Sequence, residues 1–129
     1  MLHGGIISWA CHKQTCVALY STEAEFVALS EACQEASLIR KLVYDFQAKL
    51  NEPICISEDH QSCLKMIETG KLSNRSKHID TKYHFIKDYI DKGIVSCRYC
   101  PTKDMLADFL TKPLSGTRIK ELRERCGLL

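Results

Sequence analysis

The feature that most constrains the fold is a long segment, from Thr22 to about Lys49, in which apolar residues recur every three or four positions. This is the spacing of an amphipathic helix, whose apolar face is buried while its other face meets solvent. The segment is therefore predicted to form one long helix. Its apolar positions are Leu29, Ala32, Cys33, Ala36, Ile39, Val43 and Phe46.

Two strand-like runs and two helical segments follow the long helix and predict an α/β fold. The order strand, helix, strand is typical of a crossover unit within one sheet. Glycine ends both predicted helices, as expected of a residue that favours the left-handed conformation. The predicted elements are a strand at Ile54–Ser57, a helix from His60 to Ile67 stopped by Gly70, a helix from about His78 to Asp91 ended by Gly93, and a strand at Ile94–Tyr99.

The two ends of the chain add a hairpin and two more helices. Ile6–Ala10 and Cys16–Leu19 have the composition of short strands, and the polar residues Cys11–Gln14 between them suit a turn. A helix is predicted from Pro101 to about Thr111, and a final amphipathic helix from about Gly116 to Cys126. Since the pattern contains no repeat or linker, residues 1–129 are predicted to form a single domain.

Composition predicts a globular protein and excludes several other classes. Charged residues make up 26% of the 129 positions, and the net charge of +2 is too small to indicate nucleic-acid binding by itself. No apolar run approaches the ~20 residues that span a bilayer, and the first residues lack the pattern of a signal peptide. We therefore expect no membrane partner and an intracellular location, cytoplasmic or nuclear.

The eight cysteines are scattered through segments that otherwise have the pattern of a core. In a reducing compartment such residues behave as small apolar side chains. Only Cys97 and Cys100 have the spacing of a metal-ligand pair, and on a strand that spacing directs the two thiols to opposite faces. No zinc is expected.

Three carboxylates from distant segments make the strongest chemical pattern. Glu25 lies at the start of the long helix, Asp59 follows a predicted strand, and Asp108 lies in an apolar helical segment. Carboxylates gathered from separate elements can hold two divalent ions that hydrolyse a phosphodiester. The pattern therefore predicts a nuclease site formed by these acids.

Each acid also has an ordinary structural interpretation. Thr22 and Glu25 have the spacing of a capping box, in which the carboxylate satisfies amides at the helix start. Asp59 could be the N-cap of the helix that follows it, because aspartate is among the preferred caps. Asp108 is predicted in mid-helix, where aspartate has poor propensity and no capping role, so a partner for its carboxylate is expected.

Five motifs in order resemble the carboxy-terminal ribonuclease H (RNase H) domain of copia-type retrotransposon polyproteins, and the resemblance covers nearly the whole chain. It implies an RNase H-like fold, with a mixed central sheet flanked by helices. It also implies hydrolysis of RNA in RNA–DNA hybrids with Mg²⁺ or Mn²⁺, and carries the site acids onto Glu25, Asp59 and Asp108. The motifs are Gly4–Trp9, Val17–Leu19 with Ser21–Phe26, Glu58–Ser62, Lys77–Ile86 and Ala107–Pro113.

Histidines and basic residues supply further candidates. His78 and His84 belong to the family-like segment and are candidates for an auxiliary role in proton transfer or product release, although packed histidines would explain them too. The densest basic stretch could contact the phosphates of the hybrid. A solvated loop explains that stretch equally well. Its residues are Lys71, Arg75, Lys77 and Lys82.

One departure from the family shapes the functional expectation. The family's domain opens with a strand that carries a first metal-bridging aspartate, whereas this chain begins at what resembles the second strand. It is therefore expected to be truncated at its N-terminus and to lack the first strand. Loss of a shared ligand predicts at best weak activity for the isolated chain. An upstream reverse transcriptase segment, or a chain supplying the strand, is an expected partner. The alternative is a domesticated module that binds nucleic acid or protein without catalysis.

Overall fold

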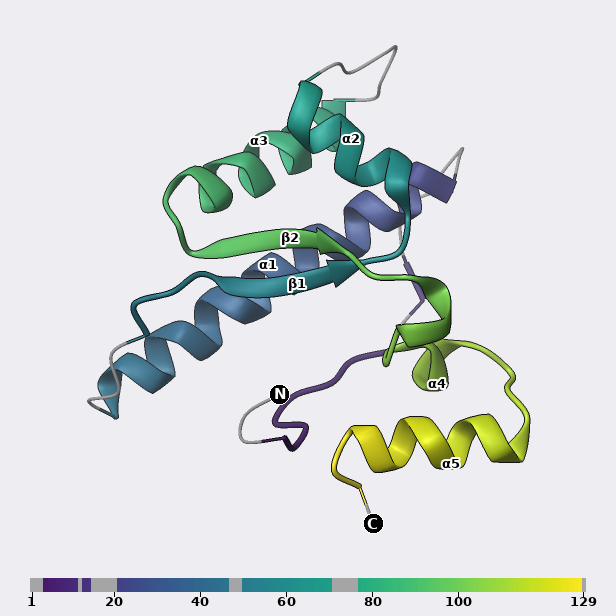
Figure 1. Ribbon diagram of the computed structural model, residues 1–129. Coiled ribbons are helices and arrows are strands. Elements are labelled where there is room, and N and C mark those ends of the chain that lie inside the picture. Colours follow the sequence, from purple (N-terminus) through teal and green to yellow (C-terminus); the bar gives the residue numbers. More distant parts are fainter. Residues whose placement is uncertain (1–3, 12, 15–20, 47–49, 71–76, 129) are drawn as a thin grey trace. The chain divides into compact units, whose positions relative to one another are not determined.

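The computed structural model describes residues 4–11, 13–14, 21–46, 50–70 and 77–128, and shows a mixed α/β protein (Figure 1). The chain forms two compact units, residues 14–100 and residues 1–13 together with 101–129. No helix in the described part is long and apolar enough to cross a membrane. The elements are α1 (Ser21–Asp45), β1 (Ile54–Glu58), α2 (Gln61–Thr69), α3 (Lys77–Asp91), β2 (Val95–Tyr99), a 3₁₀ turn (Thr102–Asp104), α4 (Asp108–Thr111) and α5 (Gly116–Arg125).

The unit of residues 14–100 is built on the parallel pair β1 and β2. Ile54 lies opposite Val95 at one end of the pair, and Glu58 lies opposite Tyr99 at the other. Helices α2 and α3 connect the strands, so the predicted crossover is confirmed. The helix ends are also as predicted, since Gly70 caps α2 in the left-handed conformation and Gly93 has a positive φ of 66° after α3.

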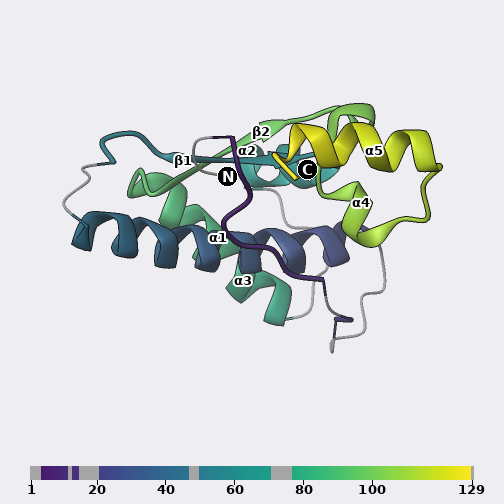
Figure 2. The same cartoon turned by 90° about the horizontal axis from the view of Figure 1, so that it is seen from below.

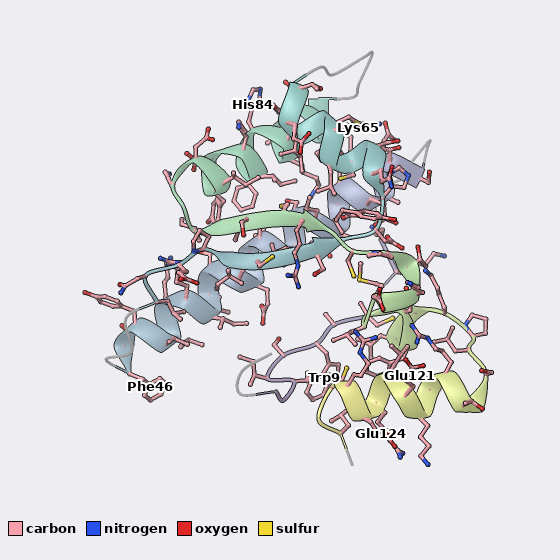
Figure 3. All side chains as sticks on the ribbon, viewed as in Figure 1. Trp9, Phe46, Lys65, His84, Glu121 and Glu124 are labelled. Carbon is pink, nitrogen blue, oxygen red and sulfur yellow. The ribbon has the colours of Figure 1, made fainter. Side chains whose placement is uncertain are left out.

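Helix α1 lies along one face of the two strands with α3 beside it (Figure 2). Its first half supplies Phe26, Leu29, Cys33 and Ala36 to the core. The second half is more exposed to solvent than the spacing of its apolar residues predicts. Helix α1 ends at Asp45, and the side chain of Phe46 beyond it is 83% exposed (Figure 3). The other buried core residues are Cys63 and Ile67 from α2, Tyr83 and Ile86 from α3, and Val95 from β2.

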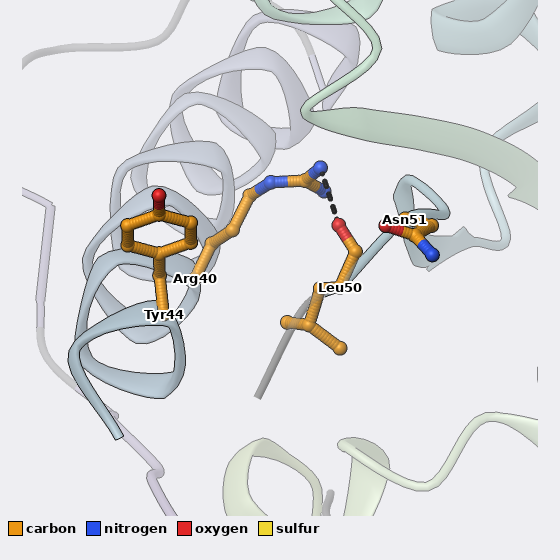
Figure 4. Close-up of a pocket in the computed structure, with 4 residues that line it drawn as sticks. All are labelled: Arg40, Tyr44, Leu50 and Asn51. Carbon is orange, nitrogen blue, oxygen red and sulfur yellow. Dashed lines mark hydrogen bonds between the residues drawn. The ribbon is translucent and has the colours of Figure 1, made fainter. Parts of the chain in front are cut away.

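Arg40 joins the second half of α1 to the segment that leads into β1. Its guanidinium donates to the carbonyl oxygens of Leu50 and Glu52, both at 2.9 Å, and to that of Ile94 at 3.4 Å. Together with Tyr44, Leu50 and Asn51 it lines a surface hollow of about 320 Å³ (Figure 4). Because the guanidinium is occupied by backbone carbonyls, the role of Arg40 here is structural.

The unit formed by the two ends of the chain departs from the predicted elements. Ile6–Ala10 is not a strand, and the Ile6 amide donates to the Cys126 carbonyl at 3.3 Å instead of to a neighbouring strand. The other predicted arm of the hairpin, Cys16–Leu19, lies outside the described residues. Helix α5 forms as predicted, with Ser115 as its N-cap and with Leu122 buried.

The predicted helix from Pro101 to Thr111 is wrong. The segment forms a 3₁₀ turn at Thr102–Asp104, and Met105 is extended, with φ −68° and ψ 110°. Helix α4 then begins only at Asp108. The extended residue interrupts the hydrogen-bond ladder that a continuous helix would need.

Candidate functional site

Three carboxylates meet where β1 ends. One oxygen each from Glu25, Glu58 and Asp59 lies within 4.8 Å of the others. Glu25 comes from the start of α1, Glu58 is the last residue of β1, and Asp59 follows directly. The structure therefore brings together two of the three predicted acids and adds one that sequence reasoning missed. We call Glu25, Glu58 and Asp59 the acid cluster.

Glu58 is the buried member of the acid cluster, with 6% of its surface exposed. Successive side chains of a strand alternate between faces, so Glu58 shares a face with Ile54 and Ile56, which pack against the core. That alternation was available in the sequence: a carboxylate in register with two core isoleucines has to be buried. Once the phase of the strand is known, this alternation marks Glu58 as a candidate site residue.

Burial is the main influence on the Glu58 carboxyl and raises its pKa. The backbone N–H of His60 donates to Oε1 at 2.9 Å and opposes this rise, while the charges of Glu25 and Asp59 add to it. The ionised cluster is thus three negative groups in close proximity, one of them largely desolvated. A divalent cation would offset both the desolvation and the repulsion.

The structure also tests the capping interpretations of Asp59 and Glu25. His60, not Asp59, is the N-cap of α2, because its Nδ1 accepts from the Cys63 amide at 3.3 Å. The alternative interpretation of Asp59 as the cap therefore does not hold. Thr22 lies inside α1, which begins at Ser21, and this position does not fit a capping box with Glu25.

Asp108 belongs to the other compact unit. It is the first residue of α4 rather than a mid-helix residue, so that prediction is wrong. Its side chain is largely buried, and Oδ1 lies 2.8 Å from the Nζ atom of Lys112. A lysine of the same chain, four residues further on, therefore pairs with this carboxylate, and the predicted metal role of Asp108 stays a prediction.

The structure describes only some of the predicted auxiliary and basic residues. His84 is exposed on α3, and its Nε2 lies 3.6 Å from Oδ1 of Asp80. Lys82 is half-buried on the same helix. Lys77 and His78 also belong to α3, but their side chains, like Lys71 and Arg75 as whole residues, lie outside the described part of the chain.

Cys33 and Cys63 are buried core residues and Cys97 packs against the core, whereas Cys55 is exposed. Burial raises the pKa of Cys33 to about 12 and that of Cys97 to about 11. Both thiols are therefore protonated near neutral pH and behave as small apolar side chains.

No protein-family model and no solved structure matches the chain. Similarity to transposon polyproteins nevertheless extends over almost all of it. Retrovirus-related Pol polyproteins from transposon TNT 1-94 of Nicotiana tabacum and transposon RE1 of Arabidopsis thaliana are 30% and 33% identical to it, over 97% and 95% of the chain. The truncated transposon Ty1-A Gag-Pol polyprotein of Saccharomyces cerevisiae is 29% identical over 97% of the chain.

The homologues of this chain are thus Pol polyproteins of copia/Ty1-type retrotransposons. The chain spans 9%, 8% and 10% of the length of these three relatives. It therefore corresponds to a small part of a large polyprotein.

Proposed function

We propose that the chain is part of the RNase H domain of a copia-type Pol polyprotein, the domain that hydrolyses the RNA strand of RNA–DNA hybrids, and that the isolated chain cleaves the hybrid at best weakly. The observation that carries this proposal is the convergence of Glu25, Glu58 and Asp59 at the end of β1. Similarity to Pol polyproteins and the motifs of the sequence support it independently of that geometry.

The donor set fits Mg²⁺ or Mn²⁺. Carboxylate oxygens are the ligands these ions prefer, and two half-buried acids flank a buried one in the acid cluster. Glu25, Glu58 and Asp59 would hold the ion, which when bound supplies Lewis-acid activation and a water of lowered pKa. The His60 amide orients the Glu58 carboxylate through its hydrogen bond, and α1 fixes the backbone of Glu25.

Cleavage of an end-labelled RNA–DNA hybrid in Mg²⁺ and in Mn²⁺ tests the proposal. Asp59→Asn keeps the size of the side chain but removes its charge, so cleavage should fall by about a hundredfold or more. The matched control is Asp88→Asn, which alters an exposed aspartate of α3 that pairs with Lys92. This control should cleave like the unmodified chain.

Two results would count against the proposal. Cleavage that is insensitive to Asp59→Asn would place the chemistry elsewhere or in a contaminant. A folded chain that binds the hybrid without metal and never cleaves it would instead support a binding module.

A further inference from the structure

Helix α2 and the end of β2 form a groove of about 280 Å³. Four of its lining residues recur on α2 at the spacing of one helix face, and Tyr99 of β2 completes it. Lys65 projects from this helix (Figure 3). The lining residues are Gln61, Leu64, Lys65, Glu68 and Tyr99.

The groove begins beside the acid cluster. Tyr99 lies directly opposite Glu58 in the strand register, and the Cys100 amide donates to the Glu58 carbonyl at 2.9 Å. Gln61 follows Asp59 by two residues, whereas Glu68 lies about 10 Å further along the helix axis. A polymer bound at the acid cluster could therefore continue into the groove from the Gln61 end.

Three donor groups line the groove without a partner among the described residues: the Gln61 amide, the Lys65 ammonium and the Tyr99 hydroxyl. Two lysines of α3 differ from Lys65, because Lys87 pairs with Asp91 and Lys92 with Asp88. Tyr99 is 47% exposed, so its ring and hydroxyl are accessible to a ligand. Lysine, glutamine and tyrosine are side chains that contact phosphates and sugars of nucleic acids.

We propose that this groove holds the sugar–phosphate backbone of the hybrid strand that adjoins the cleaved bond, with Lys65 and Tyr99 contacting phosphate. The inference rests on the proposed function, since the acid cluster defines which bond is cleaved. Glu68 would repel a phosphate at the far end, so the contacts are confined to the end near the acids. Backbone contacts of this kind position the substrate and do not select its sequence.

Binding of a fluorescein-labelled RNA–DNA hybrid to the full chain, measured by anisotropy in EDTA over a range of salt concentrations, tests the groove without cleavage. Lys65→Ala should raise Kd about fivefold and reduce the slope of log Kd against log salt by about 0.9, the contribution of one phosphate contact. Tyr99→Phe keeps the ring and loses the hydroxyl, and should raise Kd about threefold. Glu68→Gln should lower Kd.

The controls are Lys87→Ala and Tyr44→Phe, which change an exposed-face lysine of α3 and a tyrosine near the opposite end of α1 from Glu25. Both should bind like the unmodified chain, and circular dichroism verifies that every variant is folded. Unchanged Kd and salt slope in Lys65→Ala and Tyr99→Phe would overturn the inference, as would a folded chain that does not bind the hybrid.

Failure of the proposed function has a different signature. In that case neither Mg²⁺ nor Mn²⁺ supports Asp59-dependent cleavage, while the effects of Lys65→Ala and Tyr99→Phe on binding persist. If cleavage depends on Asp59 but both groove variants bind the hybrid normally, the inference about the groove is wrong while the proposed function stands.

Discussion

At the residue scale, Glu58 combines burial with negative charge, and this makes its effect on stability dependent on pH. Its pKa is raised above the ordinary value of 4.5, so the folded chain takes up the proton more readily than the unfolded chain. The free energy of unfolding should therefore decrease as pH rises from about 4.5 through the raised pKa. The stabilisation that the protonated Glu58 carboxyl contributes to folding is fully present only below about pH 4.5.

Glu58→Gln removes this dependence, because glutamine stays neutral and its amide oxygen can still accept from the His60 N–H. In EDTA at pH 7 the variant should gain on the order of 1 kcal/mol in free energy of unfolding. Urea unfolding at several pH values between 4 and 8 should show a flatter profile than that of the unmodified chain. Glu68→Gln, at an exposed position of α2, is the control, and lower stability of Glu58→Gln at pH 7 would contradict this account.

His60 is the second residue whose role follows from its local contacts. His60→Ala removes the side-chain acceptor of the Cys63 amide and should lower the free energy of unfolding by about 1 kcal/mol. His60→Asn can still cap the helix and should retain most of that stability. Equal unfolding midpoints for the alanine variant and the unmodified chain would show that the cap contributes nothing.

These two residues mark what the sequence could predict of the site. Asp59 and Glu25 were predictable because each lies at the edge of a strongly patterned element. Glu58 required the phase of the strand, since a shift of one residue exchanges the buried and exposed faces. The cap at His60 was not predicted, because histidine is not among the common N-cap residues whereas the neighbouring Asp59 is.

At the element scale, the end of α2 depends on the conformation of Gly70. Its φ of +66° is unfavourable for a residue with a Cβ atom, and an added Cβ would lie 3.3 Å from the Tyr83 hydroxyl oxygen. Gly70→Ala should therefore lower the free energy of unfolding by about 1 kcal/mol. Gly70→Asn should lose less, because asparagine tolerates this conformation better.

Gly116 provides the matched control for Gly70. It is the first residue of α5, and a Cβ built there meets nothing within 4 Å. Gly116→Ala should leave stability unchanged or raise it by up to about 1 kcal/mol, since alanine is the better helix former. Urea denaturation of both variants separates the conformational effect at Gly70 from the general effect of replacing glycine.

Elements defined by local signals were the most predictable. The glycine at the end of α2, the apolar runs of β1 and β2, and the crossover between them all follow from short stretches of sequence. The prediction of a strand at Ile6–Ala10 was wrong because a strand needs a partner. The Ile6 amide donates instead to the Cys126 carbonyl at the end of α5. The prediction of one helix after Pro101 was wrong because composition does not reveal that Met105 is extended.

At the scale of the whole molecule, the predicted acids are divided between the two compact units. Glu25 and Asp59 belong to residues 14–100, together with Glu58, whereas Asp108 belongs to the unit of the chain ends. No local pattern predicts which acids meet across units, because that depends on tertiary packing. The assignment of Asp108 to the metal site therefore stays a prediction.

Asp108→Asn in the full chain tests this assignment. If Asp108 helps to hold a second ion, the variant should lose cleavage by about a hundredfold and bind fewer Mn²⁺ ions, counted by electron paramagnetic resonance. Ion binding at the acid cluster should remain, because Glu25, Glu58 and Asp59 are unchanged. An Asp59→Asn sample measured in parallel should show the complementary loss at the acid cluster.

Lys112→Ala separates this metal-binding role from a purely structural one. It removes the ammonium that lies 2.8 Å from the Asp108 carboxylate but leaves the carboxylate itself. If the ion pair is all that Asp108 provides, the two variants should be destabilised alike, by at most a few kcal/mol, with cleavage and Mn²⁺ count retained in both. If Asp108 binds an ion, Lys112→Ala should retain cleavage while Asp108→Asn loses it, because only the carboxylate can coordinate the metal.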